Sequence, residues 1–169
     1  LNANLVDTQA SFATAGVYVL RLTVGDGRLS TSDPVQITVQ AVAAPLERRV
    51  ASSSDDAEES STGSMNLTSI NLDLVFNGSN QTVGLRFSSL AIPPGATVTR
   101  AYIQFTARKV DHGSASLDIK GQTADNPATF TGTAGNLSGR SLTTTAVSWS
   151  PPDWGKIGDA LAAQQTPEL

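Results

Sequence analysis

The chain has 169 residues, of which 15% are charged, a formal net charge of −4 and no cysteine. Abundant Gly, Ser and Thr favour an all-β chain with many turns over a helical bundle. Without cysteine, stability must come from a buried core or from bound ions. The acidic balance argues against a nucleic-acid partner, because phosphate neutralisation needs clustered Lys and Arg. The longest apolar runs, such as 17–20, are far too short to span a bilayer, so no membrane insertion is expected.

The first expected elements form a β-hairpin. Residues 17–24 alternate with a period of two, which predicts a half-buried strand. A turn follows at Gly25-Asp26-Gly27, and a second strand is expected at 35–39, after a break at Ser32-Asp33-Pro34. Asp26 and Asp33 are interpreted as turn residues. A lone hairpin is marginal in water, so these residues are expected to belong to a larger module.

Residues 1–41 resemble part of a known family. The stretch 10–27 contains Gly-x-Tyr-x-Leu at 16–20 and Asp-Gly at 26–27. With the strand pattern at 35–39, it resembles the second half of a PKD-type immunoglobulin-like domain. The resemblance implies an Ig-like β-sandwich whose first half precedes Leu1. We therefore expect the chain to be an excerpt of a longer protein or the product of processing.

A linker and a second module follow. Residues 42–47 are mostly small and include Pro45, as linkers do. From residue 48 onward, strand patterns alternate with Gly, Asn and Pro turns, which is typical of Ig-like sandwiches and jelly rolls. The expected antiparallel strands are 49–53, 64–69, 72–76, 82–87, 97–107, 115–121 and 145–149. A weak helical stretch is expected at 157–163, and the tail is expected to stop at Pro167 without a closing strand.

Residues 48–169 resemble a second family. The sequence has an acidic run at 55–59, Val-Gly-Leu-Arg-Phe at 83–87, Ile-Pro-Pro-Gly-Ala-Thr-Val at 92–98, Ala-Tyr-Ile-Gln-Phe at 101–105, and Trp149 with Trp154. This set resembles the bacterial DNRLRE-type β-sandwich family, whose members include carbohydrate-binding modules that recognise alginate. The resemblance implies a β-sandwich that binds polysaccharide. Family members continue into further strands, so the module is expected to be incomplete at its C-terminus.

The acidic run is the candidate metal site. Asp55, Asp56, Glu58 and Glu59 are hard oxygen donors in an expected Ser-flanked loop, and Ca²⁺ prefers such ligands. In an extended segment two of them point to each side, so only two or three can converge on one ion. A solvated acidic loop is the alternative. Paired-carboxylate catalysis is disfavoured, because adjacent loop residues rarely reach the separation that glycoside hydrolysis needs. The loop at 71–73 is a further source of an oxygen ligand.

The candidate ligand-binding residues are Arg100, Tyr102, Arg108 and Trp154. Alternation along 97–107 places the first three on the wetter face of one strand. Aromatic rings pack well on apolar sugar faces, and arginine pairs bidentately with carboxylates, a role also open to Arg86. Trp149 is expected to pack inward and Trp154 to be exposed. Ordinary surface charge on a solvated strand is the alternative.

The lone His112 is interpreted as a turn residue. Without a cysteine or a second histidine, the chain lacks the residues for a transition-metal site or a Ser-His-Asp triad. No set of nucleophile, base and orienting group is recognisable, so we expect no enzyme activity in this chain, whereas a parent protein is free to carry a catalytic domain elsewhere.

The sequence therefore predicts a non-catalytic extracellular module pair from a large bacterial secreted or surface protein. It is expected to be Ca²⁺-stabilised, to bind an acidic polysaccharide and to adjoin further domains of the same chain. The alternative is a purely structural spacer or adhesin stalk segment.

Overall fold

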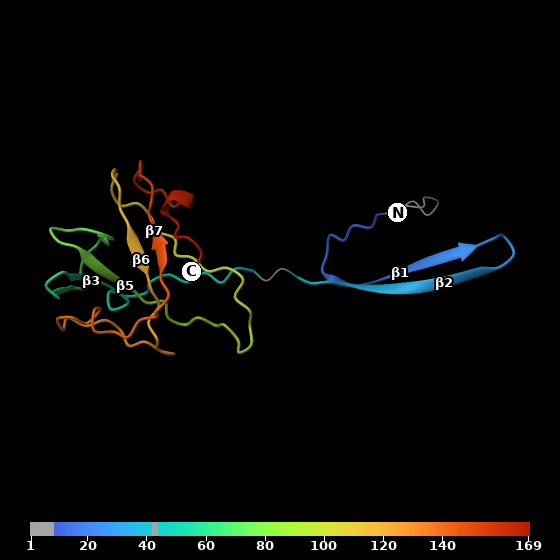
Figure 1. Ribbon diagram of the computed structural model, residues 1–169, viewed down its shortest axis with the longest axis horizontal. Coiled ribbons are helices and arrows are strands. Elements are labelled where there is room, and N and C mark those ends of the chain that lie inside the picture. The colour runs from blue at the N-terminus through green and yellow to red at the C-terminus, as the bar shows by residue number, and fades with distance from the viewer. Residues whose placement is uncertain (1–8, 42–43) are drawn as a thin grey trace. The chain divides into compact units, whose positions relative to one another are not determined.

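The computed structural model describes residues 9–41 and 44–169. The chain divides into two compact units, Leu1–Leu46 and Glu47–Leu169, so the division falls inside the predicted linker 42–47. Residues 42–43 of that linker and residues 1–8 of the predicted first module lie outside the described residues. The described residues contain small antiparallel sheets and one short 3-10 helix, with no α-helix among them (Figure 1). The expectation of an all-β chain of antiparallel sheets is confirmed.

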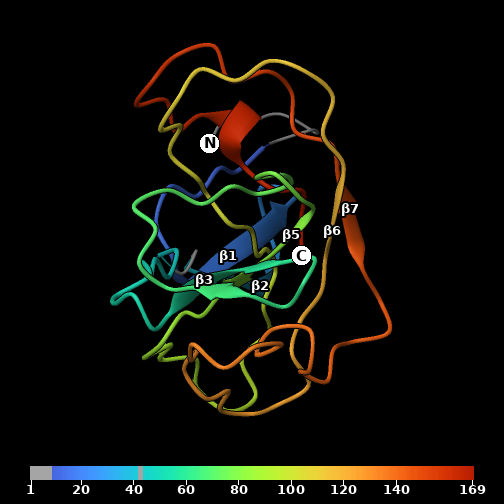
Figure 2. The same ribbon diagram turned by 90° about the vertical axis from the view of Figure 1, so that its left-hand side faces the viewer.

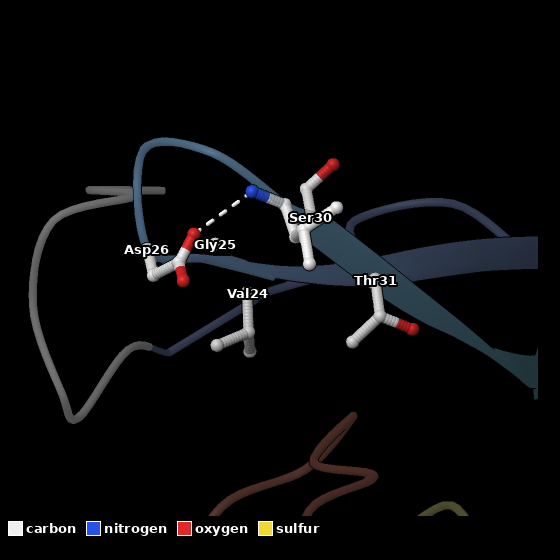
Figure 3. Close-up of a pocket in the computed structure, with 6 residues that line it drawn as sticks. Val24, Gly25, Asp26, Ser30 and Thr31 are labelled. Atoms are coloured by element: carbon white, nitrogen blue, oxygen red, sulfur yellow. Dashed lines mark hydrogen bonds between the residues drawn. The ribbon is translucent and has the colours of Figure 1, made fainter.

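The first unit is a hairpin. Strand β1 (Gly16–Gly25) pairs antiparallel with β2 (Ser30–Val39). The turn is closed by Asp26, whose carboxylate accepts hydrogen bonds from the N–H groups of Arg28 and Leu29 at 2.9 and 2.8 Å. Figure 3 draws Asp26 with the second of these bonds. The Leu29 bond, and then the Arg28 bond, lower the pKa of Asp26. The predicted turn role of Asp26 is confirmed. The open hollow beside it is lined by residues of the turn and the adjoining strand ends.

The predicted break at Ser32-Asp33-Pro34 is wrong, because β2 runs through it. Pro34 lies opposite Arg21, and Asp33 lies opposite Leu22 rather than in a turn. Antiparallel pairs alternate between hydrogen-bonded and non-bonded. The Asp26–Leu29 pair at the turn is hydrogen-bonded, with an N–O distance of 3.1 Å. Alternation along the ladder from that pair makes Arg21–Pro34 a non-bonded pair. The missing N–H of proline therefore faces the outer edge of β2, where no partner strand needs it.

The second unit contains two small sheets. Strand β3 (Asp56–Ser60) lies between β4 (Met65–Asn66) and β5 (Gln81–Leu85), and all three are antiparallel. Strands β6 (Leu117–Ile119) and β7 (Val147–Trp149) form the other sheet and run side by side in both views (Figures 1 and 2). The 3-10 helix η1 spans Ala162–Gln164. No helix among the described residues has the length and apolar character needed to cross a membrane.

Several expected strands are shorter or absent. The patterns at 82–87, 115–121 and 145–149 correspond to β5, β6 and β7, whereas 64–69 supplies only β4. Residues 49–53 form no strand, and the 72–76 stretch contributes one isolated bridge. The helical stretch expected at 157–163 is reduced to η1, which begins at Ala162.

The stretch 97–107 forms no regular strand, yet its predicted alternation holds. Odd positions from 101 to 107 are half-buried or buried, and even ones are exposed. The C-terminal segment lies along it: the Phe105 N–H donates to Gln164 at 2.9 Å, and the Thr166 N–H donates to Ile103 at 3.0 Å. No strand follows β7 in the described tail, which is held along 97–107 by these bonds and by the isolated Gln104–Gln165 bridge.

The core of the second unit is small. Ala57 on β3 packs with Phe130 and Leu137, which both come from the long segment between β6 and β7. A second apolar contact is made by Trp149, which is 5% exposed and stacks on Phe105 with ring centroids 5.7 Å apart. The predicted inward packing of Trp149 is confirmed. Ala57 lies on the same strand as the acidic run, so this core sits beside the candidate metal ligands.

Candidate functional site

The acidic run lies at the centre of a sheet rather than in a loop. Asp55 immediately precedes β3, and the other three carboxylates lie on that strand. Asp55, Glu58 and Glu59 are only 5%, 3% and 3% exposed. Both the loop expectation and the solvated alternative are therefore wrong for these three residues. Buried carboxylates need hydrogen-bond or charge partners, and the surrounding segments supply them.

Glu59 binds the backbone of a distant segment. Its Oε2 accepts hydrogen bonds from the N–H groups of Leu137 and Ser138 at 2.7 and 3.0 Å. Burial raises the pKa of Glu59, but bonds from the hydroxyl and N–H of Ser138 and from the N–H of Leu137 outweigh it, so the pKa is lowered. Glu59 therefore stays ionised and fixes the turn that carries the core residue Leu137.

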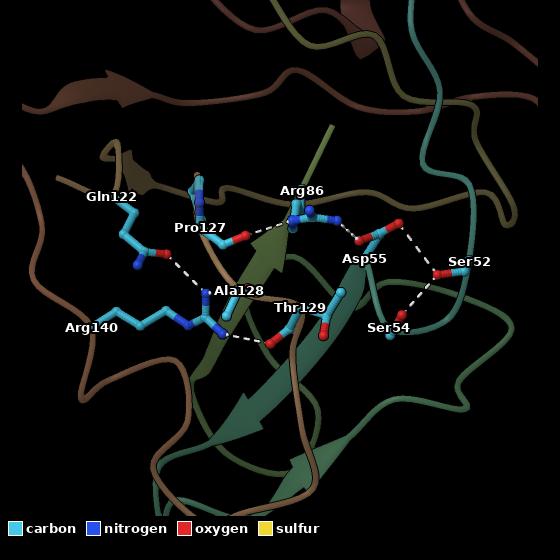
Figure 4. Close-up of polar contacts among 9 residues, drawn as sticks. All are labelled: Ser52, Ser54, Asp55, Arg86, Gln122, Pro127, Ala128, Thr129 and Arg140. Atoms are coloured by element: carbon cyan, nitrogen blue, oxygen red, sulfur yellow. Dashed lines mark hydrogen bonds and ion pairs between the residues drawn. The ribbon is translucent and has the colours of Figure 1, made fainter. Parts of the chain in front are cut away.

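Asp55 pairs with Arg86, which follows β5. The Arg86 Nη1 lies 2.5 Å from Asp55 Oδ1, and its Nε donates to the carbonyl of Pro127 at 2.8 Å (Figure 4). The other Asp55 oxygen accepts a 3.3 Å bond from the Ser52 hydroxyl. Arg86 is thus engaged inside the unit, and its predicted availability to a ligand carboxylate is wrong. Removing one partner of this part-buried pair leaves the other charge without its partner, which destabilises the fold.

Glu58 points to the opposite side of β3. Its Oε1 accepts a 2.5 Å bond from the Asp73 N–H, and its Oε2 a 3.5 Å bond from the Asn66 side chain. The Asp73 carboxylate in turn accepts a 2.9 Å bond from the Asn77 amide. Adjacent carboxylates of β3 therefore tie loops on opposite faces of the sheet.

These residues do not fit a shared Ca²⁺ site. Asp55 already faces a guanidinium, both oxygens of Glu58 accept from N–H donors, and Oε2 of Glu59 accepts from two backbone N–H groups. The carboxylate of Asp73, in the loop at 71–73, is also engaged: Oδ2 accepts a hydrogen bond from Asn77, and Oδ1 lies 3.8 Å from Lys109 Nζ. Across residues 9–41 and 44–169, no group of three or more His, Cys, Asp or Glu is arranged to hold a metal ion. The Ca²⁺ prediction, which includes Asp56, gains no support from these contacts.

Arg140 is an organising residue that the sequence did not reveal. Its guanidinium donates to the carbonyls of Ala128 and Thr129 at 2.9 and 3.0 Å and to Gln122 Oε1 at 2.8 Å (Figure 4). It also lies over the Phe130 ring, 4.5 Å from the centroid. Arg86 and Arg140 thus hold neighbouring carbonyls of one segment. The Gly-Arg that ends a Gly- and Asn-rich turn is the only sequence signal for this role.

Two predicted ligand-binding residues meet on the surface. The Arg100 guanidinium lies over the Tyr102 ring, 5.6 Å from its centroid, and Tyr102 is 49% exposed. We call this pair the Arg100–Tyr102 surface. Arg108 is also exposed, but it lies in a bend six residues after Tyr102, beyond the alternating stretch 101–107. Of these three predicted residues, the structure shows contact between Arg100 and Tyr102.

Trp154 does not join this surface. Its ring is half-buried against Phe105, with centroids 6.4 Å apart, and its Nε1 donates to the Ala163 carbonyl at 3.0 Å. The prediction that Trp154 is exposed is wrong. Residues 101–107 form an apolar face that needs covering, and Trp154 helps to cover it.

His112 contacts Asp153 on the surface. Its Nδ1 lies 3.1 Å from the Asp153 carboxylate, which also accepts a 3.1 Å bond from the Gly113 N–H. The Gly113 bond, and then His112, lower the pKa of Asp153. Both side chains are exposed. The contact joins two chain segments, in line with the turn role expected for His112.

Comparison of this chain with protein-family models, curated proteins and solved structures found no match. The resemblances to PKD-type and DNRLRE-type domains therefore stay predictions from the sequence.

Proposed function

We propose that this chain is a non-catalytic extracellular module of a large bacterial secreted or surface protein, and that its second unit binds an acidic polysaccharide. The observation that carries the proposal is the Arg100–Tyr102 surface, where a guanidinium lies over a half-exposed aromatic ring. Neighbouring domains of the same parent chain are the other proposed partners.

The chemistry of this pair suits a sugar acid. A guanidinium stacked on a ring keeps its N–H donors in its own plane, where they can pair bidentately with a carboxylate. The free parts of the Tyr102 ring offer an apolar surface for sugar C–H groups, and its hydroxyl offers a hydrogen bond. Because the chain has a net charge of −4, an acidic ligand meets long-range repulsion. We therefore expect binding to depend on this local cation and on salt.

The acidic strand supports the non-catalytic part of the proposal. Acid-base catalysis needs a carboxyl group within reach of the substrate. Asp55, Glu58 and Glu59 are instead buried and bound to internal donors. Their contacts bind loops together, which is a structural role.

A purely structural spacer is the second candidate. The observation that favours it is this same use of three buried carboxylates to tie separate segments. A spacer needs such internal ties but no surface that recognises a ligand.

Affinity electrophoresis of the full chain tests the proposal. Native gels would contain a polyuronate, a sulfated polysaccharide or a neutral glucan. We expect retardation in the polyuronate gel and none in the neutral gel. Free migration in all three gels would contradict the binding proposal and favour the spacer. Retardation only by the sulfated polymer would also contradict the assignment to sugar carboxylates.

A further inference from the structure

The loop after Asp73 presents an exposed Asn-Gly pair. An isolated bridge between Phe76 and Asn80 closes a turn that contains Asn77, Gly78 and Ser79. Asn77 and Gly78 are both exposed. Asn77 is the only asparagine of the sequence that is followed by glycine. The pair is therefore open to water and free of a bulky following side chain.

The surroundings of Gly78 are open. Gly78 has a φ of +69°, and the space beside its Cα is open, because a Cβ added there would meet no atom within 4 Å. Within the part of the chain that the structure describes, the Gly78 N–H donates no hydrogen bond, whereas the Asn77 N–H donates to the Ser79 carbonyl at 3.0 Å. A free amide next to the asparagine side chain is the arrangement that cyclisation needs.

We propose that Asn77 is a site of spontaneous deamidation. The Gly78 backbone nitrogen loses its proton and attacks Cγ of Asn77, so a new N–C bond forms. The bond between Cγ and Nδ2 breaks, and the side-chain nitrogen leaves as ammonia with the proton balance completed by solvent. Water then opens the resulting cyclic imide at either carbonyl. The products are aspartate and isoaspartate at position 77.

Deamidation removes the hydrogen bond between Asn77 and Asp73, and Asp73 in turn binds Glu58 on β3. The Asn77 amide donates to Asp73 Oδ2 at 2.9 Å, and the Asp73 N–H binds Glu58. A carboxylate at position 77 cannot donate this bond and places a second negative charge beside Asp73. Like charges at this distance repel each other. Deamidation is therefore expected to loosen the loop near Asp73, the residue that hydrogen-bonds to Glu58 on β3.

Ageing of the intact chain tests the site directly. The folded protein would be incubated in mildly alkaline buffer, digested and analysed by mass spectrometry for both acidic isomers. We expect residue 77 to convert faster than the internal controls Asn66, Asn80 and Asn136. Conversion of any of these at an equal or greater rate, or persistence of the Asn77 amide throughout, would overturn the proposal. Asn77→Gln is the matched variant, and we expect it to keep its amide.

A second measurement tests the consequence. Asn77→Asp should lower the thermal unfolding midpoint, and adding Asp73→Asn should recover part of the loss, because a neutral amide at position 73 removes the repulsion. An Asn77→Asp midpoint equal to that of the original chain would overturn the predicted loosening of the loop.

Discussion

The N–H of Leu137 donates a 2.7 Å hydrogen bond to the Glu59 carboxylate across 78 positions of sequence. The Leu137 side chain packs in the core with Ala57, which lies two residues before Glu59 on the same side of β3. A buried charge and an apolar core thus share one face of the central strand. The carboxylate fixes the backbone of the segment whose side chains form the core.

Replacing Glu59 should therefore destabilise the second unit. Glu59→Ala leaves the N–H groups of Leu137 and Ser138 without their acceptor, at a cost of about 2–4 kcal/mol in the free energy of unfolding. Glu59→Gln keeps one acceptor oxygen and should lose less. Urea-induced unfolding measures both. Glu47→Ala removes a carboxylate from an exposed ion pair and should change the free energy by less than about 0.5 kcal/mol. Equal effects at positions 47 and 59 would contradict a stabilising role for the hydrogen bonds from Leu137 and Ser138 to Glu59.

The same Glu59 hydrogen bonds predict that the free energy of unfolding depends on pH. The pKa of Glu59 is lower in the folded chain than its ordinary value. Such a group stabilises the fold above its unfolded pKa, about 4.3 for glutamate, and this contribution is lost as pH falls through the folded pKa. The difference in unfolding free energy between the original chain and Glu59→Gln should therefore be largest near neutral pH and shrink in acid. A difference that stays constant across this range would exclude an ionised Glu59 as its cause.

The sequence predicted the elements whose pattern is local. The β1–β2 hairpin and the strands β5, β6 and β7 follow from alternation and turn residues. The alternation along 101–107 also holds, although that stretch pairs with the C-terminal segment instead of forming a regular strand. The predicted break at Pro34 is wrong. A strand tolerates proline where the proline nitrogen faces away from the partner strand. The side that the nitrogen faces depends on the register of the whole hairpin.

The candidate site was harder to predict, because its contacts join residues far apart in sequence. A run of four carboxylates within five residues has the composition of a solvated loop or an ion site. Its burial is made favourable by Arg86 and by the N–H groups of Asp73, Leu137 and Ser138, none of which the run itself reveals. The Arg100–Tyr102 contact was predictable, because alternation alone places positions 100 and 102 on one face.

Gly84 is a packing constraint on the same core. It lies on β5 opposite Ala57, and an added Cβ would overlap the Leu137 side chain and lie 2.7 Å from that of Phe130. Gly84→Ala should therefore lower the free energy of unfolding by about 1–3 kcal/mol. Gly132→Ala is the matched control, because a Cβ there meets no atom within 4 Å. Thermal unfolding of the two variants compares them, and a neutral Gly84→Ala would show that this core is looser than described.

Removal of divalent cations tests the Ca²⁺ prediction. Because Asp55, Glu58 and Glu59 are bound to Arg86 and to backbone N–H groups, we expect the thermal unfolding midpoint to be the same with and without a chelator. Adding Ca²⁺ back after chelation is the control for chelator effects. A midpoint that falls on chelation and recovers with Ca²⁺ would contradict the view that these carboxylates are stabilised by protein contacts alone. It would support an ion near the acidic run.

The most direct test of the proposed function is calorimetric titration of the full chain with an oligouronate. We expect binding by the original chain and a loss of affinity of about tenfold or more, equivalent to roughly 1.4 kcal/mol, in Arg100→Ala and Tyr102→Ala. Arg28→Ala removes the same charge from the turn of the hairpin and should bind like the original chain. Undiminished binding by both Arg100→Ala and Tyr102→Ala, or no binding by the original chain, would contradict recognition of sugar acids by the Arg100–Tyr102 surface.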